Sequence, residues 1–129
     1  MSLSNYRVGA AAAVSDMKRA REFYEGLLGL VPATDHEPTN NIAYACADGT
    51  LIHVFLSPYA GTAKSTMAGW FVPDLEDVVD ELTAKGVPFE HYSEGPIITD
   101  ARGIAHFDGN NRVAYFTDPD GNILSLAST

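Results

Sequence analysis

Residues 14–30 read VSDMKRAREFYEGLLGL, a pattern that predicts the end of a strand followed by an amphipathic helix. Ser15 or Asp16 can cap this helix, because a short polar side chain at that position accepts a hydrogen bond from a free backbone amide of the first turn. The apolar residues recur at three- and four-residue spacing and are Met17, Ala20, Phe23, Tyr24, Leu27 and Leu28. Gly29 ends the pattern. We therefore predict a helix over residues 17–28, preceded by a strand over residues 7–14.

The same order begins again near residue 67. Residues 67–72 predict a strand, and Pro73 and Asp74 follow it. A second set of apolar residues then recurs at helical spacing and consists of Leu75, Val78, Val79 and Leu82. Lys85 and Gly86 close this helix with a cation and then a residue that is free to adopt positive φ.

Each helix is followed by further strand patterns. In the first half, two apolar runs flank Asp48 and Gly49, which is a strong signal for a hairpin. In the second half, two apolar runs flank the turn at residues 118–121 in the same way. The predicted strands are residues 42–47, 51–56, 87–92, 112–117 and 122–127, with a loop over residues 95–107 that holds a short strand around Ala105.

The two halves also match residue by residue. VSD at residues 14–16 falls on VPD at residues 72–74, and DG at residues 48–49 falls on DG at residues 120–121. The offset between the halves grows from 58 to 72 positions along the chain. The second half therefore carries an insertion, which we place around residues 95–110, and the chain is a duplicated module rather than a solenoid.

A strand, a helix and three strands, written twice, predict an α+β fold of two βαβββ modules. Module one spans about residues 5–58 and module two about residues 66–129. We expect a single domain over residues 1–129, since domains of roughly 100 to 150 residues are the commonest size. Apolar residues make up 46% and charged residues 19%, near the globular average, so the chain is expected to fold by itself.

The charge balance argues against several partners. Eight Lys and Arg against 17 Asp and Glu give a net charge of -9, which repels phosphate backbones and anionic lipids. Neither nucleic acid nor a membrane is therefore expected as a partner. No apolar run reaches the roughly 18 residues of a membrane span, and no signal peptide pattern is present, so we expect a cytoplasmic protein. Cys46 is the only cysteine and is interpreted as a small buried apolar residue.

Two segments carry a resemblance to a known family. VSDMKRAREFYEGLLGL at residues 14–30 and AYFTDPDGNILSLAS at residues 114–128 lie at the first helix and the last hairpin of the duplicated chain. In those places they resemble the glyoxalase, bleomycin-resistance and ring-cleaving dioxygenase proteins, the vicinal oxygen chelate superfamily. The resemblance implies that each module curls its strands into half of an open barrel that holds a ligand or a metal. These motifs indicate the fold and not the reaction.

The resemblance also implies where the family's enzymes would hold a divalent metal, on the first and last strands of each module. Counted from the motifs, the four positions fall on Gly9, His53, Met67 and Ser125. Only His53 is an ordinary ligand, since glycine offers no donor, a neutral hydroxyl binds poorly, and a thioether is too soft for magnesium, manganese, nickel or ferrous iron. We therefore expect no metal at this site and no other cofactor.

Alternation along the strands predicts which side chains line the half-barrels. The predicted cavity face carries Gly9, Ala11, Ala13, Leu51, His53, Phe55, Met67, Gly69, Phe71, Ile123, Ser125 and Ala127. The predicted core face carries Val8, Val14, Ile52, Val54, Trp70, Val72, Leu124 and Leu126. The small cavity-face residues leave room, and the two phenylalanines and the thioether suit a flat apolar or aromatic ligand. Neighbouring side chains that simply fill the barrel would give the same pattern.

Histidines and tyrosines supply the candidate polar groups. His53 could donate a hydrogen bond to a ligand or act as a general base. Hydroxyl groups at the mouth could come from Tyr44, Tyr59, Tyr92 and Tyr115, and Asp100 and Arg102 lie in the long loop that could form its rim. His36, His91 and His106 are further candidates, although none has the spacing of a local metal site. The predicted ligand-binding set is His53, Phe55, Met67, Phe71, Ser125, Tyr44, Tyr115 and His106.

The function expected from this reading is sequestration of an apolar or aromatic small molecule, as in the metal-free bleomycin-resistance proteins that the chain most resembles. The resemblance also implies a homodimer with ligand grooves at or near the subunit interface. The alternative is a lyase, isomerase or oxidoreductase of the glyoxalase or dioxygenase type. Such an enzyme would need further metal ligands from His91, His106 or a partner chain, or would use His53 as its base.

Overall fold

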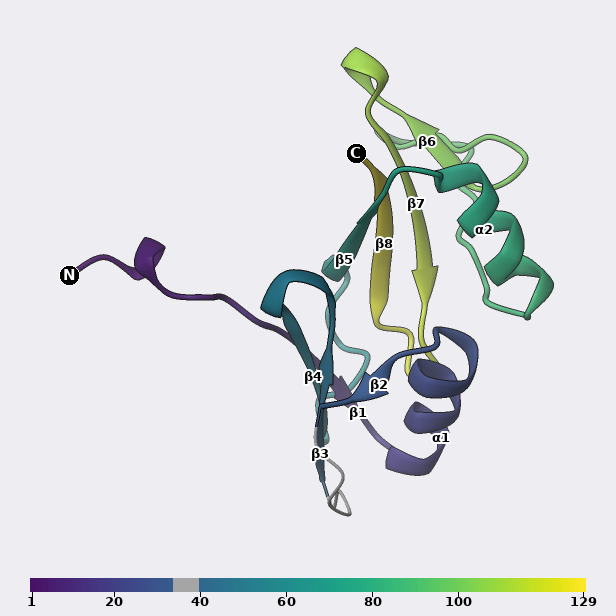
Figure 1. The fold of residues 1–129 in the computed structure, drawn as a ribbon. Coiled ribbons are helices and arrows are strands. Elements are labelled where there is room, and N and C mark those ends of the chain that lie inside the picture. The colour runs from purple at the N-terminus through teal and green to yellow at the C-terminus, as the bar shows by residue number, and fades with distance from the viewer. Residues whose placement is uncertain (34–39) are drawn as a thin grey trace.

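The computed structural model describes residues 1–33 and 40–129 (Figure 1). His36 lies outside the described residues. Each half of the chain builds one four-stranded mixed sheet, and the two sheets follow the same plan. The α+β fold of two βαβββ modules is therefore confirmed. None of the helices in the described ranges has the length and hydropathy needed to cross a bilayer.

The first sheet is built from residues 10–56. Its elements are β1 (Ala10–Val14), α1 (Met17–Arg21), a π-helical turn (Glu22–Leu27), β2 (Val31–Pro32), β3 (Asn41–Ala45), a short turn (Ala47–Gly49) and β4 (Leu51–Leu56). The strand order is β1-β4-β3-β2, with β1 parallel to β4. The hairpin predicted around Asp48 and Gly49 is confirmed, and both residues have positive φ, 57° and 75°.

The second sheet repeats this plan. Its elements are β5 (Thr66–Val72), α2 (Leu75–Ala84), β6 (Ile104–His106), β7 (Arg112–Thr117) and β8 (Ile123–Ser128). The strand order is β5-β8-β7-β6, and β5 runs parallel to β8 as β1 does to β4. The second helix ends as predicted, with Lys85 as its C-cap and Gly86 at a φ of 96°.

The strand predicted over residues 87–92 is wrong. Phe89 forms only an isolated bridge, to Phe116 of β7. Pro88 has no amide hydrogen, so this segment cannot build an even ladder along β7. β6 pairs with the other end of β7, which confirms the short strand predicted around Ala105.

The first helix begins as predicted. Asp16 is its N-cap, and its carboxylate accepts a hydrogen bond from the Arg19 amide at 3.1 Å. The helix differs from the prediction in its second half, which is π-helical, with the Leu28 amide donating to the Phe23 carbonyl at 3.0 Å. Apolar spacing of three and four residues fits both geometries, so the sequence predicts the helix but not the wider turn.

The first helix contributes to packing on both sheets. The ring centroid of Phe23 lies 6.4 Å from that of Phe116 in β7, and the ring of Tyr24 stacks on Tyr44 of β3 at 6.2 Å. The buried apolar residues of both modules form one cluster. The predicted core face is buried at Val14, Ile52, Val54, Leu124 and Leu126 and half-buried at Trp70 and Val72.

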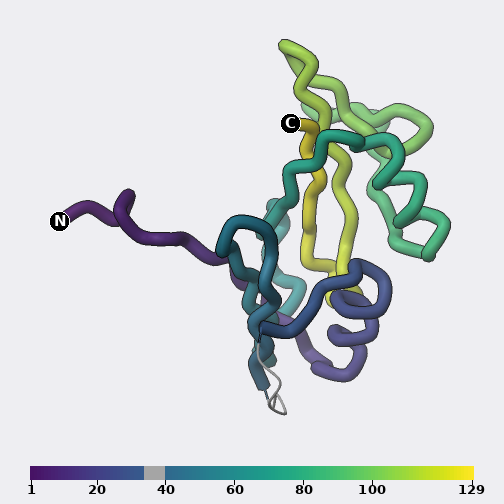
Figure 2. The backbone as a smooth tube through the Cα atoms, in the orientation of Figure 1, coloured from purple at the N-terminus to yellow at the C-terminus, as the bar shows by residue number. Residues whose placement is uncertain are grey.

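Val8 departs from the predicted core face, because it is 86% exposed. The N-terminal end of the chain extends away from both sheets (Figures 1 and 2), and β1 begins only at Ala10. No second layer therefore covers Val8, and the alternation of the strand does not continue through it.

A buried polar cluster ties the last hairpin of the second module to the first module. The Asp118 carboxylate, in a residue only 4% exposed, accepts hydrogen bonds from the Tyr24 hydroxyl at 2.7 Å and the Asn122 side-chain amide at 2.8 Å. It also accepts from the backbone amides of Asp120 and Asn122. The Asn122 amide donates to the Ala13 carbonyl of β1 at 2.6 Å. We call Tyr24, Asp118 and Asn122 the hairpin clamp.

Candidate functional site

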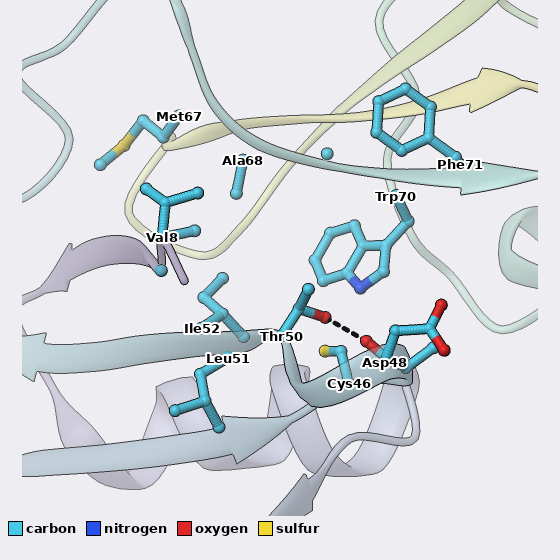
Figure 3. A pocket seen from close by; sticks show the side chains of 14 residues that line it. Val8, Cys46, Asp48, Thr50, Leu51, Ile52, Met67, Ala68, Trp70 and Phe71 are labelled. Atoms are coloured by element: carbon cyan, nitrogen blue, oxygen red, sulfur yellow. Dashed lines mark hydrogen bonds between the residues drawn. The ribbon is translucent and has the colours of Figure 1, made fainter. Parts of the chain in front are cut away.

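A cleft of about 550 Å³ lies between β5 and the beginnings of β1 and β4 (Figure 3). Its lining is predominantly apolar. The residues are Val8, Gly9, Ala10, Cys46, Ala47, Asp48, Thr50, Leu51, Ile52, Met67, Ala68, Gly69, Trp70 and Phe71. Met67 and Phe71 belong to the predicted site, whereas the turn at residues 46–50 and Trp70 were not predicted to take part.

β5 supplies the longest wall of the cleft. Its pairing with β8 slips by one residue between Thr66 and Ala68, so Met67 sits in a β-bulge. Bulges re-aim the side chain that they carry, which here gives the cleft a thioether. Phe71 is 78% exposed, so a large aromatic surface faces solvent beside this wall.

Trp70 extends from β5 toward Thr50 and the turn that carries Cys46 and Asp48 (Figure 3). Its indole also stacks against Phe116 of the core, with centroids 6.3 Å apart. Within the described ranges, no hydrogen bond forms at its indole N–H. The cleft therefore has one wall that combines an aromatic surface with a free hydrogen-bond donor.

Ser125 lies outside the cleft lining, on the face of the second sheet that the helices leave uncovered. It pairs with Gly69 of β5 and with Tyr115 of β7. A Cβ atom at Gly69 would overlap the Ser125 hydroxyl oxygen, so the glycine gives this side chain its room. The Tyr115 ring meets Tyr92 edge-on at 6.1 Å, and partial burial raises the pKa of Tyr92.

His53 and Phe55 lie on β4 and do not line the cleft. His53 pairs with Ala11 of β1 and Ala43 of β3, so its half-buried ring is flanked by small side chains. Phe55 pairs with Ala13 in the same way. No hydrogen bond to the His53 imidazole occurs among residues 1–33 and 40–129. The ring is therefore free to meet a ligand but is not oriented as a general base by a neighbouring group.

Tyr44 is placed elsewhere. It is fully buried on the covered face, and its hydroxyl donates to a Glu25 carboxylate oxygen at 2.8 Å. Burial and this carboxylate raise the pKa of Tyr44, while the hydrogen bond from Arg21 lowers the pKa of Glu25 despite partial burial. The alternation that puts Ile42 in the core also puts Tyr44 there, so its hydroxyl does not reach the uncovered face.

His106 is also placed away from the cleft. On the edge strand β6 it pairs with Arg112, whose guanidinium forms an ion pair with Glu76 of α2, so both side chains lie on the helix side of the sheet. Its Nε2 lies 3.0 Å from Asp100 Oδ2. Burial raises the pKa of Asp100, but hydrogen bonds from His106 and from backbone amides outweigh it, and the net pKa is lowered.

The donor set at the family's metal positions does not fit a divalent ion. Gly9 offers no side chain, Met67 a thioether and Ser125 a neutral hydroxyl, which leaves the His53 imidazole as the only ordinary ligand. Elsewhere in the described ranges, no three residues of the types His, Cys, Asp and Glu gather into a group that could hold a metal. We derive no step through a metal at this site.

Two βαβββ modules, each with its first and last strands paired in parallel, define the vicinal oxygen chelate fold. The uncovered strand faces and the cleft beside β5 correspond to its open half-barrels. The Glyoxalase/Bleomycin resistance protein/Dioxygenase superfamily matches residues 8–126, and the chain belongs to this superfamily. No curated protein matches the sequence.

Solved structures with this fold include an antibiotic binding protein, a bleomycin resistance determinant and a lyase. TnmS3, an antibiotic binding protein from Streptomyces sp. CB03234, is 21% identical with a TM-score of 0.68, over 95% of each chain. The bleomycin resistance determinant of transposon Tn5 is 18% identical with a TM-score of 0.69, over 96% of this chain and 98% of that one. Lactoylglutathione lyase from Agrobacterium tumefaciens is 16% identical with a TM-score of 0.69, over 95% and 92%. At these identities the likeness establishes the fold alone.

Proposed function

We propose that this protein binds an apolar or aromatic small molecule in the cleft beside β5 and does not transform it. The observation that carries this proposal is the lining of the cleft, where Met67, Trp70 and Phe71 present apolar surface from a single strand. A volume of about 550 Å³ suits a drug-sized ligand. Ligand atoms beyond the cleft would extend over the uncovered face that carries Ser125 and Tyr115.

Few polar groups could orient the ligand. The Trp70 indole N–H suits an acceptor on the ligand, and Asp48 puts a carboxylate in the lining near it. His53 and Phe55 lie on the neighbouring sheet and would meet only a ligand that reaches across β1. We therefore expect a flat ring system with one acceptor, held mainly by burial of apolar area.

Several points favour binding over catalysis. The donors at the family's metal positions do not fit a metal, and no neighbour orients His53 as a base within the described chain. TnmS3, which shares the fold, is an antibiotic binding protein. We propose that residues 1–129 act as one domain that needs no cofactor, works in the cytoplasm, and has a small molecule rather than nucleic acid as its partner, in keeping with its net charge of -9.

Replacement of Phe71 by serine tests the cleft. We expect affinity for an aromatic ligand to fall by roughly ten- to fiftyfold, because the ligand loses one aromatic wall. Aromatic natural products and flavins are the compounds to screen, with quenching of Trp70, the single tryptophan, as the signal. Tyr59→Ser is the matched control, since Tyr59 is 75% exposed and outside the cleft. Equal affinities of wild type and Phe71→Ser would contradict the site.

The same titration separates binding from turnover. Bound compound should be recovered unchanged by mass spectrometry after long incubation. His53→Ala should then leave both binding and compound intact. Loss of a measurable conversion in His53→Ala, with binding retained, would instead favour the enzyme alternative with His53 as a base.

We also propose that the protein forms a homodimer, in which each chain covers the strand faces that the helices of the other leave open. Residues 1–9 carry Leu3, Tyr6 and Val8, which are 77%, 64% and 86% exposed, and Phe71 lies exposed on β5. Apolar exposure on this scale favours a surface that a second chain covers. Light scattering at micromolar concentration should give twice the mass of one chain, and Val8→Asp should lower it. A monomer at all concentrations would contradict the dimer.

A further inference from the structure

We propose a second binding site, on the opposite side of β5 from the first, for a small flat aromatic molecule that carries one charged or polar group. A cavity of about 250 Å³ lies between the end of the first helix, β5 and α2. Its walls include Leu28, Trp70, Leu82 and Phe116, and Glu81 and Lys85 lie among its lining residues. It lies on the helix-covered side, where the sequence predicts only core.

The walls of this cavity are built for a planar ring. The rings of Trp70 and Phe116 both line the cavity, with centroids 6.3 Å apart and planes inclined by 26°, so a planar ring that lies on Trp70 is also roughly parallel to Phe116. Phe116 is fully buried, while Leu28 and Leu82 are only partly buried although they pack on the core. The apolar side chains around the cavity therefore do not fill the space between them, and an inserted ring would fill it.

Two charged side chains beside the cavity indicate which polar group the ligand carries. Glu81 and Lys85 of α2 form an ion pair 3.7 Å apart, with side chains 67% and 45% exposed. Such an exposed pair is weak, so either charge can turn to a ligand at little cost. An aromatic carboxylate meets the Lys85 ammonium in this way, while its ring lies on Trp70. A volume of about 250 Å³ admits one or two fused rings.

Trp70 lines both the cleft and the smaller cavity, so the two sites share one side chain. A ring stacked on Trp70 in the smaller cavity fixes the indole that also faces the cleft. The second site stands on its own geometry and does not depend on the proposed ligand of the cleft.

A titration with 2-naphthoate, followed in amide-resolved NMR spectra, tests the second site. We expect saturable shifts in α2 and at residues 28–30, with a Kd between about 10 μM and 1 mM for a probe of this size. Lys85→Gln should weaken binding several-fold, and Leu82→Phe, which fills the cavity, at least about tenfold. Lys64→Gln is the charge-matched control and should bind like wild type.

Three results would overturn this proposal. Shifts confined to residues 46–51 and 67–71 would place the probe in the cleft alone. Shifts that never saturate would mean that no site exists. Shifts of the α2 amides on raising protein concentration without probe, lost in Lys85→Gln, would show that a second copy covers this face. If Leu82→Phe fails to fold, Lys85→Gln and its control still decide the outcome.

Discussion

Asp118→Ala is expected to lower the free energy of unfolding by about 4 kcal/mol. The substitution removes the acceptor of the hairpin clamp and leaves the Tyr24 hydroxyl, one of the two side-chain N–H groups of Asn122 and two backbone amides without an acceptor. Buried donors without acceptors lose their hydration and gain nothing in return. Urea unfolding followed by circular dichroism measures the change.

Two variants separate the clamp from a general effect of losing a carboxylate. Asp108→Ala removes an exposed aspartate from a turn of the same module and should change the free energy of unfolding by less than about 0.5 kcal/mol. Tyr24→Phe removes one donor, so its effect and that of Asp118→Ala should be strongly non-additive in the double variant. Additive effects, or an Asp118→Ala protein as stable as wild type, would contradict the clamp.

Stability should fall steeply above about pH 10, because two buried tyrosines must keep their protons in the folded state. Burial, and then Asp118, raise the pKa of Tyr24 above the ordinary value of 10.0, and burial and Glu25 do the same for Tyr44. A raised folded pKa means that this stability is complete below pH 10 and is lost as pH rises further. In this range each tyrosine lowers the free energy of unfolding by about 1.4 kcal/mol per pH unit. The two together lower it by roughly 3 kcal/mol per pH unit.

The free energy of unfolding, measured in urea between about pH 8 and pH 11.5, checks this slope. Tyr24→Phe should roughly halve it, because one of the two retained protons is gone. Tyr59→Phe should leave it unchanged, since that ring is 75% exposed and ionises alike in both states. A flat profile up to pH 11.5 in the wild type would mean that neither hydroxyl stays protonated in the folded protein.

Most of the fold follows from local patterns in the sequence. Helix caps such as Asp16, the Asp-Gly turn of the first hairpin and strict alternation on β4 and β8 each have a local physical cause, and all are found where predicted. The prediction of a strand over residues 87–92 is wrong because it rests on the apolar content of the segment. The pairing is decided instead by Pro88, which lacks an amide hydrogen, and by β6, which pairs with the same edge of β7. Those are properties of the assembled sheet and not of the segment.

The candidate site was less accessible to such reasoning. Alternation assigned Met67 and Phe71 to a cavity face, and both line the cleft, but it could not show that the cleft wraps around the edge of β5 and takes in Trp70 from the other face. Tyr44 and His106 were placed by residue type rather than by strand face. The position of a free edge depends on how two modules meet, which no local pattern encodes.

The hairpin clamp also fixes the order in which the chain can mature during synthesis. The Tyr24 hydroxyl and its acceptor on Asp118 are 94 positions apart. At ordinary translation rates of roughly 5–20 residues per second, the first module waits about 5–20 s for that acceptor to leave the ribosome. A nascent chain stalled before residue 118 should thus remain open to proteases through its first helix, and resistance should appear only once the last hairpin has emerged.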